Sequence, residues 1–291
     1  MFFKQSTATL PAWFRQDIPD PIAMRAMRQL LRTSSLHSVC ESSRCPNQGH
    51  CWERRVATFM ILGDICTRTC RFCAVASGIP IAVDPAEPEH IGQAVQDLGL
   101  KYVVITSVTR DDLADQGAGQ FVLTVEMIRR LNPGVGIELL VPDFSGREEL
   151  VCQVASIQPE VVGHNIETVE RLYPRVRTSG DYRRALDVLS GFKKAGAPAV
   201  KSGFMVGLGE TAEEIFQTIR DLKSAGCDMI TIGQYLAPTR QNRHVPVARF
   251  VPPEEFQQYE RAAREIGIAQ VAAGPLVRSS FMAEELFSVS R

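Results

Sequence analysis

The chain has 291 residues, enough for one large domain or two modest ones, and 45% of them are hydrophobic, which allows a substantial core. A formal net charge of −1 gives no general attraction to nucleic acid, so we expect no nucleic-acid partner. We expect no membrane span, because no run of about 18 apolar residues occurs. The first residues lack the apolar core of a secretory signal, and the acidic residues Asp17 and Asp20 argue against a transit peptide, so we expect a cytoplasmic protein.

The first expected element is a helix over Ile22–Leu31, and after Ala57 apolar runs typical of strands alternate with helical patterns. The strands are expected over Ala57–Leu62, Tyr102–Thr106, Gly136–Val141, Val161–His164, Ala199–Val206 and Met229–Ile232. The helices are expected over Glu89–Leu98, Gln120–Leu131, Glu148–Ile157, Tyr182–Lys194, Ala212–Ala225 and Pro253–Ile266.

This alternation predicts an α/β fold with a parallel sheet, either open or closed into a complete or partial barrel. In such barrels the chemistry lies at the carboxyl ends of the strands, and a group of cysteines follows the expected strand that ends at Leu62. The segment before Ala57 is expected to form an arm packed on this unit.

Cysteines are concentrated in one part of the chain: six of the eight fall between Cys40 and Cys73. A disulfide framework requires an oxidising compartment, and nothing in the sequence points to export. We therefore expect the crowded cysteines to bind metal. Cys152 and Cys227 lie outside the group and are expected to be packing residues.

The downstream triplet, Cys66, Cys70 and Cys73, has the spacing C-x3-C-x2-C with the aromatic Phe72 before its last member. Three thiolates hold a four-iron cubane and leave one iron open, and S-adenosylmethionine (SAM) chelates such an iron before its carbon–sulfur bond is cleaved. This spacing resembles the motif of the radical SAM superfamily. The alternative is a zinc or purely structural site.

The upstream triplet, Cys40, Cys45 and Cys51, has the spacing C-x4-C-x5-C. Beside the downstream triplet it indicates a second cluster, again with one iron lacking a thiolate. The alternative is a set of scattered core cysteines.

The two triplets in succession resemble the pattern of lipoyl synthases. Further segments similar to that family are 57–63, 106–113, 164–169 and 231–236, and the similarity runs from about Trp13 to about Phe281. The resemblance implies a partial (β/α)6 TIM-type barrel of the radical SAM class with N-terminal and C-terminal extensions. Residues 1–56 would form an arm carrying the upstream triplet, residues 57–270 the barrel, and residues 271–291 a segment that supplies a further ligand.

That ligand is implied by the sequence Arg278-Ser279-Ser280-Phe281, which resembles an Arg-Ser-Ser-Tyr motif of the family. Its second serine is the fourth ligand of the auxiliary cluster, which maps to Ser280. A hard, weak serine ligand suits a cluster that is taken apart. Arg278 is expected to donate hydrogen bonds to the cluster sulfides.

The resemblance also implies the reaction. Two [4Fe–4S] clusters and SAM would insert two sulfur atoms at carbons 6 and 8 of a protein-bound octanoyl-lysine, with the auxiliary cluster as the sulfur source. The implied partners are octanoylated carriers (the glycine-cleavage H protein and acyltransferase subunits of 2-oxoacid dehydrogenases), a reductant such as ferredoxin or flavodoxin, and cluster-assembly proteins. Expected SAM contacts are Phe72, Thr106, Ser107, Arg110, Asn165, Glu167, Lys201 and Gly207.

Three departures from the family pattern stand out. Phe281 replaces a tyrosine, Gln116 stands where the family commonly has glycine, and the loop Pro238–Val247 is slightly longer than usual. If the turn at Gln116 requires a left-handed residue, glutamine costs about 1 kcal/mol there.

Two rival functions stay open. One is another sulfur-inserting radical SAM enzyme, closer to biotin synthase, whose auxiliary ligands are expected from the barrel strands. The other is an electron carrier or cluster scaffold, which would need complete protein ligation, whereas the downstream triplet offers three thiolates.

Overall fold

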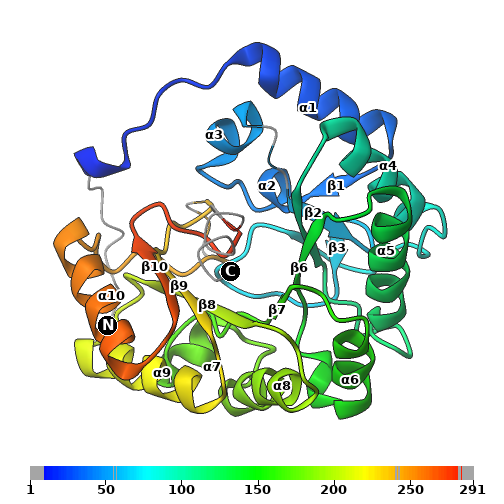
Figure 1. Ribbon diagram of the computed structural model, residues 1–291. Coiled ribbons are helices and arrows are strands. Elements are labelled where there is room, and N and C mark those ends of the chain that lie inside the picture. The colour runs from blue at the N-terminus through cyan, green and yellow to red at the C-terminus, as the bar shows by residue number, and fades with distance from the viewer. Residues whose placement is uncertain are drawn as a thin grey trace.

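The structure is a computed structural model, which describes residues 10–54, 56, 58–239, 241, 243–280 and 283. Its main feature is an eight-stranded sheet in the order β1-β2-β5-β6-β7-β8-β9-β10, curved with helices on its outer face (Figure 1). In the described residues the edge strands β1 and β10 pair with one neighbour each, so the sheet is a partial barrel. The strands are β1 His37–Ser38, β2 Thr58–Ile61, β5 Tyr102–Ser107, β6 Gly136–Leu140, β7 Val161–Gly163, β8 Val200–Val206, β9 Met229–Gln234 and β10 Gln270–Gly274.

Strands β2 and β5 to β10 are parallel, and only β1 runs antiparallel to its neighbour. Parallel strands need crossover helices, and the apolar strand and helix faces pack into one large core. The helices of the barrel are α4 Glu87–Leu98, α5 Ala118–Leu131, α6 Glu148–Ser156, α7 Tyr173–Val176, α8 Tyr182–Lys194, α9 Ala212–Ser224 and α10 Pro253–Ile266, with 3-10 turns η2 Phe144–Gly146 and η3 Glu170–Leu172.

Local sequence signals set the helix ends. Thr211 and Glu214 form a reciprocal capping box at the start of α9, and α10 ends at Gly267, whose φ of 99° is left-handed. The expected α/β partial barrel is confirmed, and α8 and α10 match their predicted bounds. The sequence reading did not include β1 or β10. No helix in the described residues is long and apolar enough to cross a bilayer.

The N-terminal arm contains η1 Ala12–Phe14, α1 Pro21–Thr33, α2 Val39–Ser42 and α3 Gln48–Glu53. It is joined to the segment after β10, because the Asn47 side chain donates a hydrogen bond of 2.6 Å to the carbonyl of Leu276. Further along, Ala283 packs on Tyr102 and Val104 of β5. Both extensions thus meet at the barrel, although the boundary expected at residue 270 falls on the first residue of β10.

Candidate functional site

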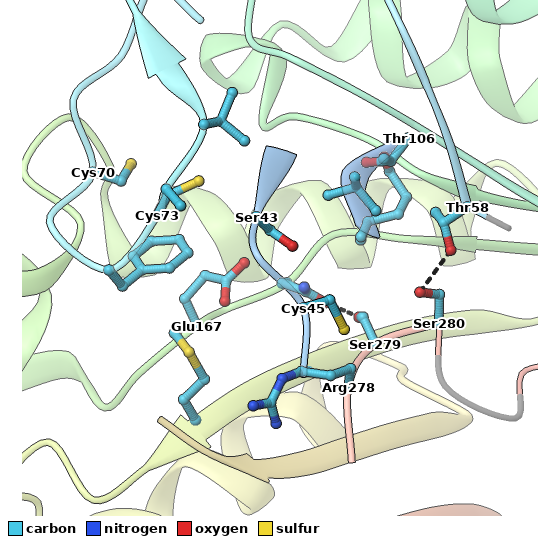
Figure 2. A pocket seen from close by; sticks show the side chains of 18 of the residues that line it. Ser43, Cys45, Thr58, Cys70, Cys73, Thr106, Glu167, Arg278, Ser279 and Ser280 are labelled. Atoms are coloured by element: carbon cyan, nitrogen blue, oxygen red, sulfur yellow. Dashed lines mark hydrogen bonds between the residues drawn. The ribbon is translucent and has the colours of Figure 1, made fainter. Parts of the chain in front are cut away.

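A cavity of about 450 Å³ opens at the carboxyl ends of the barrel strands. All three thiols of the downstream triplet line it, as do Cys40 and Cys45 of the upstream triplet and the run Arg278, Ser279 and Ser280. Figure 2 shows Cys70 and Cys73 on one side and Cys45 with the two serines on the other. The barrel therefore brings together residues that are far apart in the sequence.

The downstream triplet lies in a loop that begins with the short strand β3 (Ile65–Cys66), which pairs with β4 (Ala76–Ser77). The Cys66 sulfur accepts hydrogen bonds of 3.4 Å from the backbone N–H groups of Arg68 and Thr109. The sulfur is thereby held by the loop itself and by the segment that follows β5.

Burial raises the pKa of the two other thiols of this triplet. It is the main cause that raises the pKa of Cys70 to about 11 and that of Cys73 to about 12. The charges of Glu167 and Cys66 raise both values further. A cationic iron centre between these side chains would relieve both effects.

The donor set fits a cluster better than a single ion. In the described part of the chain, no three His, Cys, Asp or Glu side chains lie close enough to hold one metal ion. All eight cysteines are free, so no disulfide joins them. A cubane binds each thiolate at a different iron corner, so it accepts thiols that surround a cavity without converging on one point.

The upstream triplet lies on two short helices of the arm. Cys40 is in α2, Cys51 is in α3, and Cys45 lies in the turn between them, where its N–H donates to the Cys40 carbonyl. Burial, followed by the charges of Cys40 and Cys45, raises the pKa of Cys51 to about 12. The three thiols are therefore electrostatic neighbours, although Cys51 does not line the cavity.

The segment after β10 lies along the cavity wall. Thr58 in β2 donates a hydrogen bond of 2.8 Å to Ser280 (Figure 2). Ser279 donates one of 2.6 Å to the side-chain oxygen of Asn165. Burial lowers the pKa of Arg278, and the neighbouring Cys45 opposes that shift. The guanidinium donates to the backbone carbonyl of Val277. Phe281 lies outside the described residues.

Five of the expected SAM contacts line the cavity: Phe72, Thr106, Ser107, Asn165 and Glu167. Glu167 has a left-handed backbone with φ of 67°, a strained conformation that is typical of functional sites. Burial raises the pKa of its carboxyl group, while Arg177 and Asn165 act in the opposite direction. The Ser107 hydroxyl is buried and has no hydrogen-bond partner in the described part of the chain, so it is open to a ligand.

Three other expected contacts do not line the cavity. Lys201 is 2.8 Å from Glu138 Oε1 in a buried pair, so it neutralises a carboxylate of the protein itself. Arg110 pairs with Asp112 at 2.8 Å. Gly207, with φ of 92°, is needed for packing, because a side chain there would clash with Gln234.

The sequence reading missed Arg177, a buried cation that lines the cavity. It donates hydrogen bonds to the Asn165 carbonyl and to the Tyr173 hydroxyl. No sequence pattern around this arginine indicates that its charge lies at the cavity. The reading of Cys152 as a packing residue was wrong, because its side chain is exposed on α6, whereas Cys227 is buried as expected.

Gln116, the residue in a glycine position, has a left-handed backbone with φ of 49° and is followed by Gly117 with φ of 86°. The turn therefore does impose the conformation for which glycine is suited. The glutamine side chain is buried and accepts a hydrogen bond of 3.3 Å from the Ser145 hydroxyl.

Comparison with known proteins identifies the family. The model of the Radical SAM superfamily matches residues 60–222. The chain is 50% identical over 277 residues to the lipoyl synthase of Rubrobacter xylanophilus, covering 94% of this chain and 85% of the relative. It is 48% identical over 286 residues to the lipoyl synthase of Caldanaerobacter subterraneus subsp. tengcongensis, covering 98% of this chain and 99% of the relative.

Solved structures support the fold alone. The FeFe-hydrogenase maturase HydG from Carboxydothermus hydrogenoformans aligns with a TM-score of 0.53 at 13% identity, covering 92% of this chain and 78% of that one. Methylornithine synthase aligns with a TM-score of 0.50 at 15% identity, covering 73% of this chain and 69% of that one. Sequence and fold agree, and the chain belongs to the lipoyl synthase family of radical SAM enzymes.

Proposed function

We propose that this radical SAM sulfur-inserting enzyme works with two [4Fe–4S] clusters facing one cavity. The downstream triplet would hold the cluster that binds SAM, and the upstream triplet with Ser280 would hold the auxiliary cluster. The observation that carries the proposal is that thiols of both triplets, together with Ser280, line the same cavity. A sulfur source must be within reach of a carbon radical, because such a radical is quenched if it has to diffuse.

When bound, the clusters would supply an adenosyl radical from SAM and the inorganic sulfur for insertion. The chain's own residues would bind and shield the reactants. The cavity wall offers groups that suit SAM, which has a nucleoside part and an amino acid part. They are the ring of Phe72, the hydroxyls of Thr106 and Ser107, the amide of Asn165 and the carboxyl group of Glu167. Arg278 would donate hydrogen bonds toward the auxiliary site, because its half-buried side chain is an electrostatic neighbour of Cys45.

The cavity wall also suits an alkyl chain. Apolar side chains from several elements line it, including Val39, Met60, Leu140, Met205 and Leu236. An octanoyl chain has no polar group at carbons 6 and 8, so binding depends on apolar contact and on exclusion of water. We propose octanoyl-lysine on the glycine-cleavage H protein or on acyltransferase subunits of 2-oxoacid dehydrogenases as the substrate, with ferredoxin or flavodoxin as electron donor and assembly proteins to rebuild the cluster.

Anaerobic turnover on an octanoylated carrier peptide tests this function. The expected product has gained two sulfur atoms and lost two hydrogens, detected by mass spectrometry, together with 5′-deoxyadenosine. Cleavage of SAM without any mass gain on the peptide would contradict the substrate. A protein that binds iron but fails to cleave SAM under strong reductant would favour the electron carrier instead.

A further inference from the structure

Arg68 lies between the first two cysteines of the downstream triplet, and its side chain is only 7% exposed. Its guanidinium donates two hydrogen bonds to Asp111, of 2.8 Å from Nε and 2.7 Å from Nη2. Its remaining terminal nitrogen, Nη1, is 2.8 Å from Asp143 Oδ1. Two carboxylates that follow different strands, β5 and β6, therefore hold one residue of the cysteine loop.

Asp143 is the more deeply buried of the two carboxylates, with a side chain 1% exposed. Its second oxygen is 2.8 Å from Nε of Arg184 on α8. The carboxylate thus bridges two arginines, and together with Asp111 it balances their two positive charges. Asp143 does not line the cavity, but its ion pair with Arg68 joins it to a residue that does.

The backbone after Asp143 is strained in a way that sets this geometry. Phe144, Ser145 and Gly146 have φ values of 45°, 52° and 77°, three successive residues in the left-handed region. Non-glycine residues avoid this region unless the surroundings impose it. A side chain at Gly146 would lie 3.2 Å from Cδ of Arg184, so the glycine leaves room for the arginine that supports Asp143.

We propose that Asp143 is a positioning residue for the downstream triplet. Through Arg68 it fixes the first turn of the loop, and with it the backbone N–H of Arg68 that points at the Cys66 sulfur. The loop is thereby attached to the end of β6 and, by way of Arg184, to α8. The inference deepens the proposed function, but its first test uses the protein without clusters and stands apart from it.

The first test is amide hydrogen exchange of the cluster-free protein. Asp143→Asn keeps the shape but leaves one acceptor oxygen for two arginines, so one of them faces an amide NH₂ group. Exchange in residues 66–73 is expected to rise by about tenfold, because a bond to a charged group is lost, while β8 and α9 stay unchanged. Glu149→Gln, which breaks the exposed pair of Arg147 and Glu149, is the matched control and should leave the loop unchanged.

Arg184→Met provides a second route if Asp143→Asn loosens the whole fold. Arg184 is partly exposed, so its removal weakens the support of Asp143 at lower cost, and a smaller rise in exchange should appear in the same residues. Arg184→Lys, which keeps the charge, should restore most of the protection. Unchanged exchange of residues 66–73 in both Asp143→Asn and Arg184→Met would overturn the proposal.

The second test reads the cluster itself. In a chain whose upstream triplet is replaced by alanine, only the downstream cluster contributes to the electron paramagnetic resonance spectrum. Asp143→Asn should change the g values of that reduced cluster and their response to SAM, because the hydrogen bond to Cys66 changes. A spectrum identical to that of the parent chain, at equal iron content, would contradict the positioning role.

Discussion

The two cysteine triplets are held in different ways. Charged side chains from the ends of β5 and β6 fix the downstream loop, through the pairs of Arg68 with Asp111 and Asp143. The upstream triplet lies on two short helices with local backbone hydrogen bonds, and its long-range support includes the bond from Asn47 to the Leu276 carbonyl. The difference matches the proposed roles. The cluster that binds SAM is used in every turnover and needs a rigid site, whereas the auxiliary cluster gives up its sulfur and must be taken apart.

The largest expected effect separates the two triplets. Replacing the downstream triplet by alanine should abolish both SAM cleavage and sulfur insertion, whereas replacing the upstream triplet should abolish only sulfur insertion. Each replacement should remove about four of about eight irons per reconstituted chain. Iron content and 5′-deoxyadenosine release measure both. Sulfur insertion by the chain lacking the upstream triplet would refute the role of that triplet.

The adjacent residues Ser279 and Ser280 test whether the auxiliary site depends on a serine ligand. Ser280→Ala removes the proposed ligand and should slow sulfur insertion by at least about tenfold, with SAM cleavage retained. Ser279→Ala is the control, since it loses only the hydrogen bond to Asn165 and leaves the proposed ligand in place. Product formation on an octanoylated peptide measures both variants. Equal losses would show that the segment matters only as packing.

The ion pairs of Asp143, which hold the downstream loop through Arg68, should stabilise the fold less at low pH. Burial opposes ionisation of Asp143, but Arg68, Arg177 and Arg184 outweigh it and lower the pKa to about 2 from 3.8. A carboxylate with a depressed pKa stabilises the fold above its unfolded pKa, by about 2 kcal/mol here, and this is lost as the pH falls from about 4 toward 2. The stability gap between the parent and Asp143→Asn, measured by urea unfolding, should therefore narrow between pH 7 and pH 3.

The smallest expected effect concerns the partner of Ser280. Thr58→Val keeps the shape and removes one hydrogen bond, worth about 1 kcal/mol, so sulfur insertion should fall by no more than about tenfold. Thr124→Val removes a similar buried hydrogen bond, to the Gln120 carbonyl in α5, and neither residue lines the cavity. Only the Thr58 variant should change the rate. A similar drop in both would mean that stability alone is responsible.

The order of strands and helices could be predicted because the apolar runs and their spacing are local. The two triplets could be found because cysteines are rare and their spacing is specific. Strand β1 has two residues and β10 reads Gln-Val-Ala-Ala-Gly, so neither has a strong signal. These strands form because they complete the edges of a sheet that already exists.

The placement of polar side chains was less predictable. Lys201 and Arg110 carry the charge expected near a cofactor, yet the fold pairs each with a carboxylate of its own. No sequence pattern indicated a role for Asp143, because that role depends on a left-handed turn and on two arginines at distant positions. Such roles arise from tertiary contacts, which single-sequence patterns do not encode.

The hydrogen bond between Thr58 and Ser280 joins residues 222 positions apart, whereas Arg68 and Asp111 are separated by 43. A nascent chain leaving the ribosome therefore carries both carboxylates that hold Arg68 long before Ser280 is synthesised. The proposed auxiliary site includes Ser280, so it can be complete only when nearly the whole polypeptide has been synthesised.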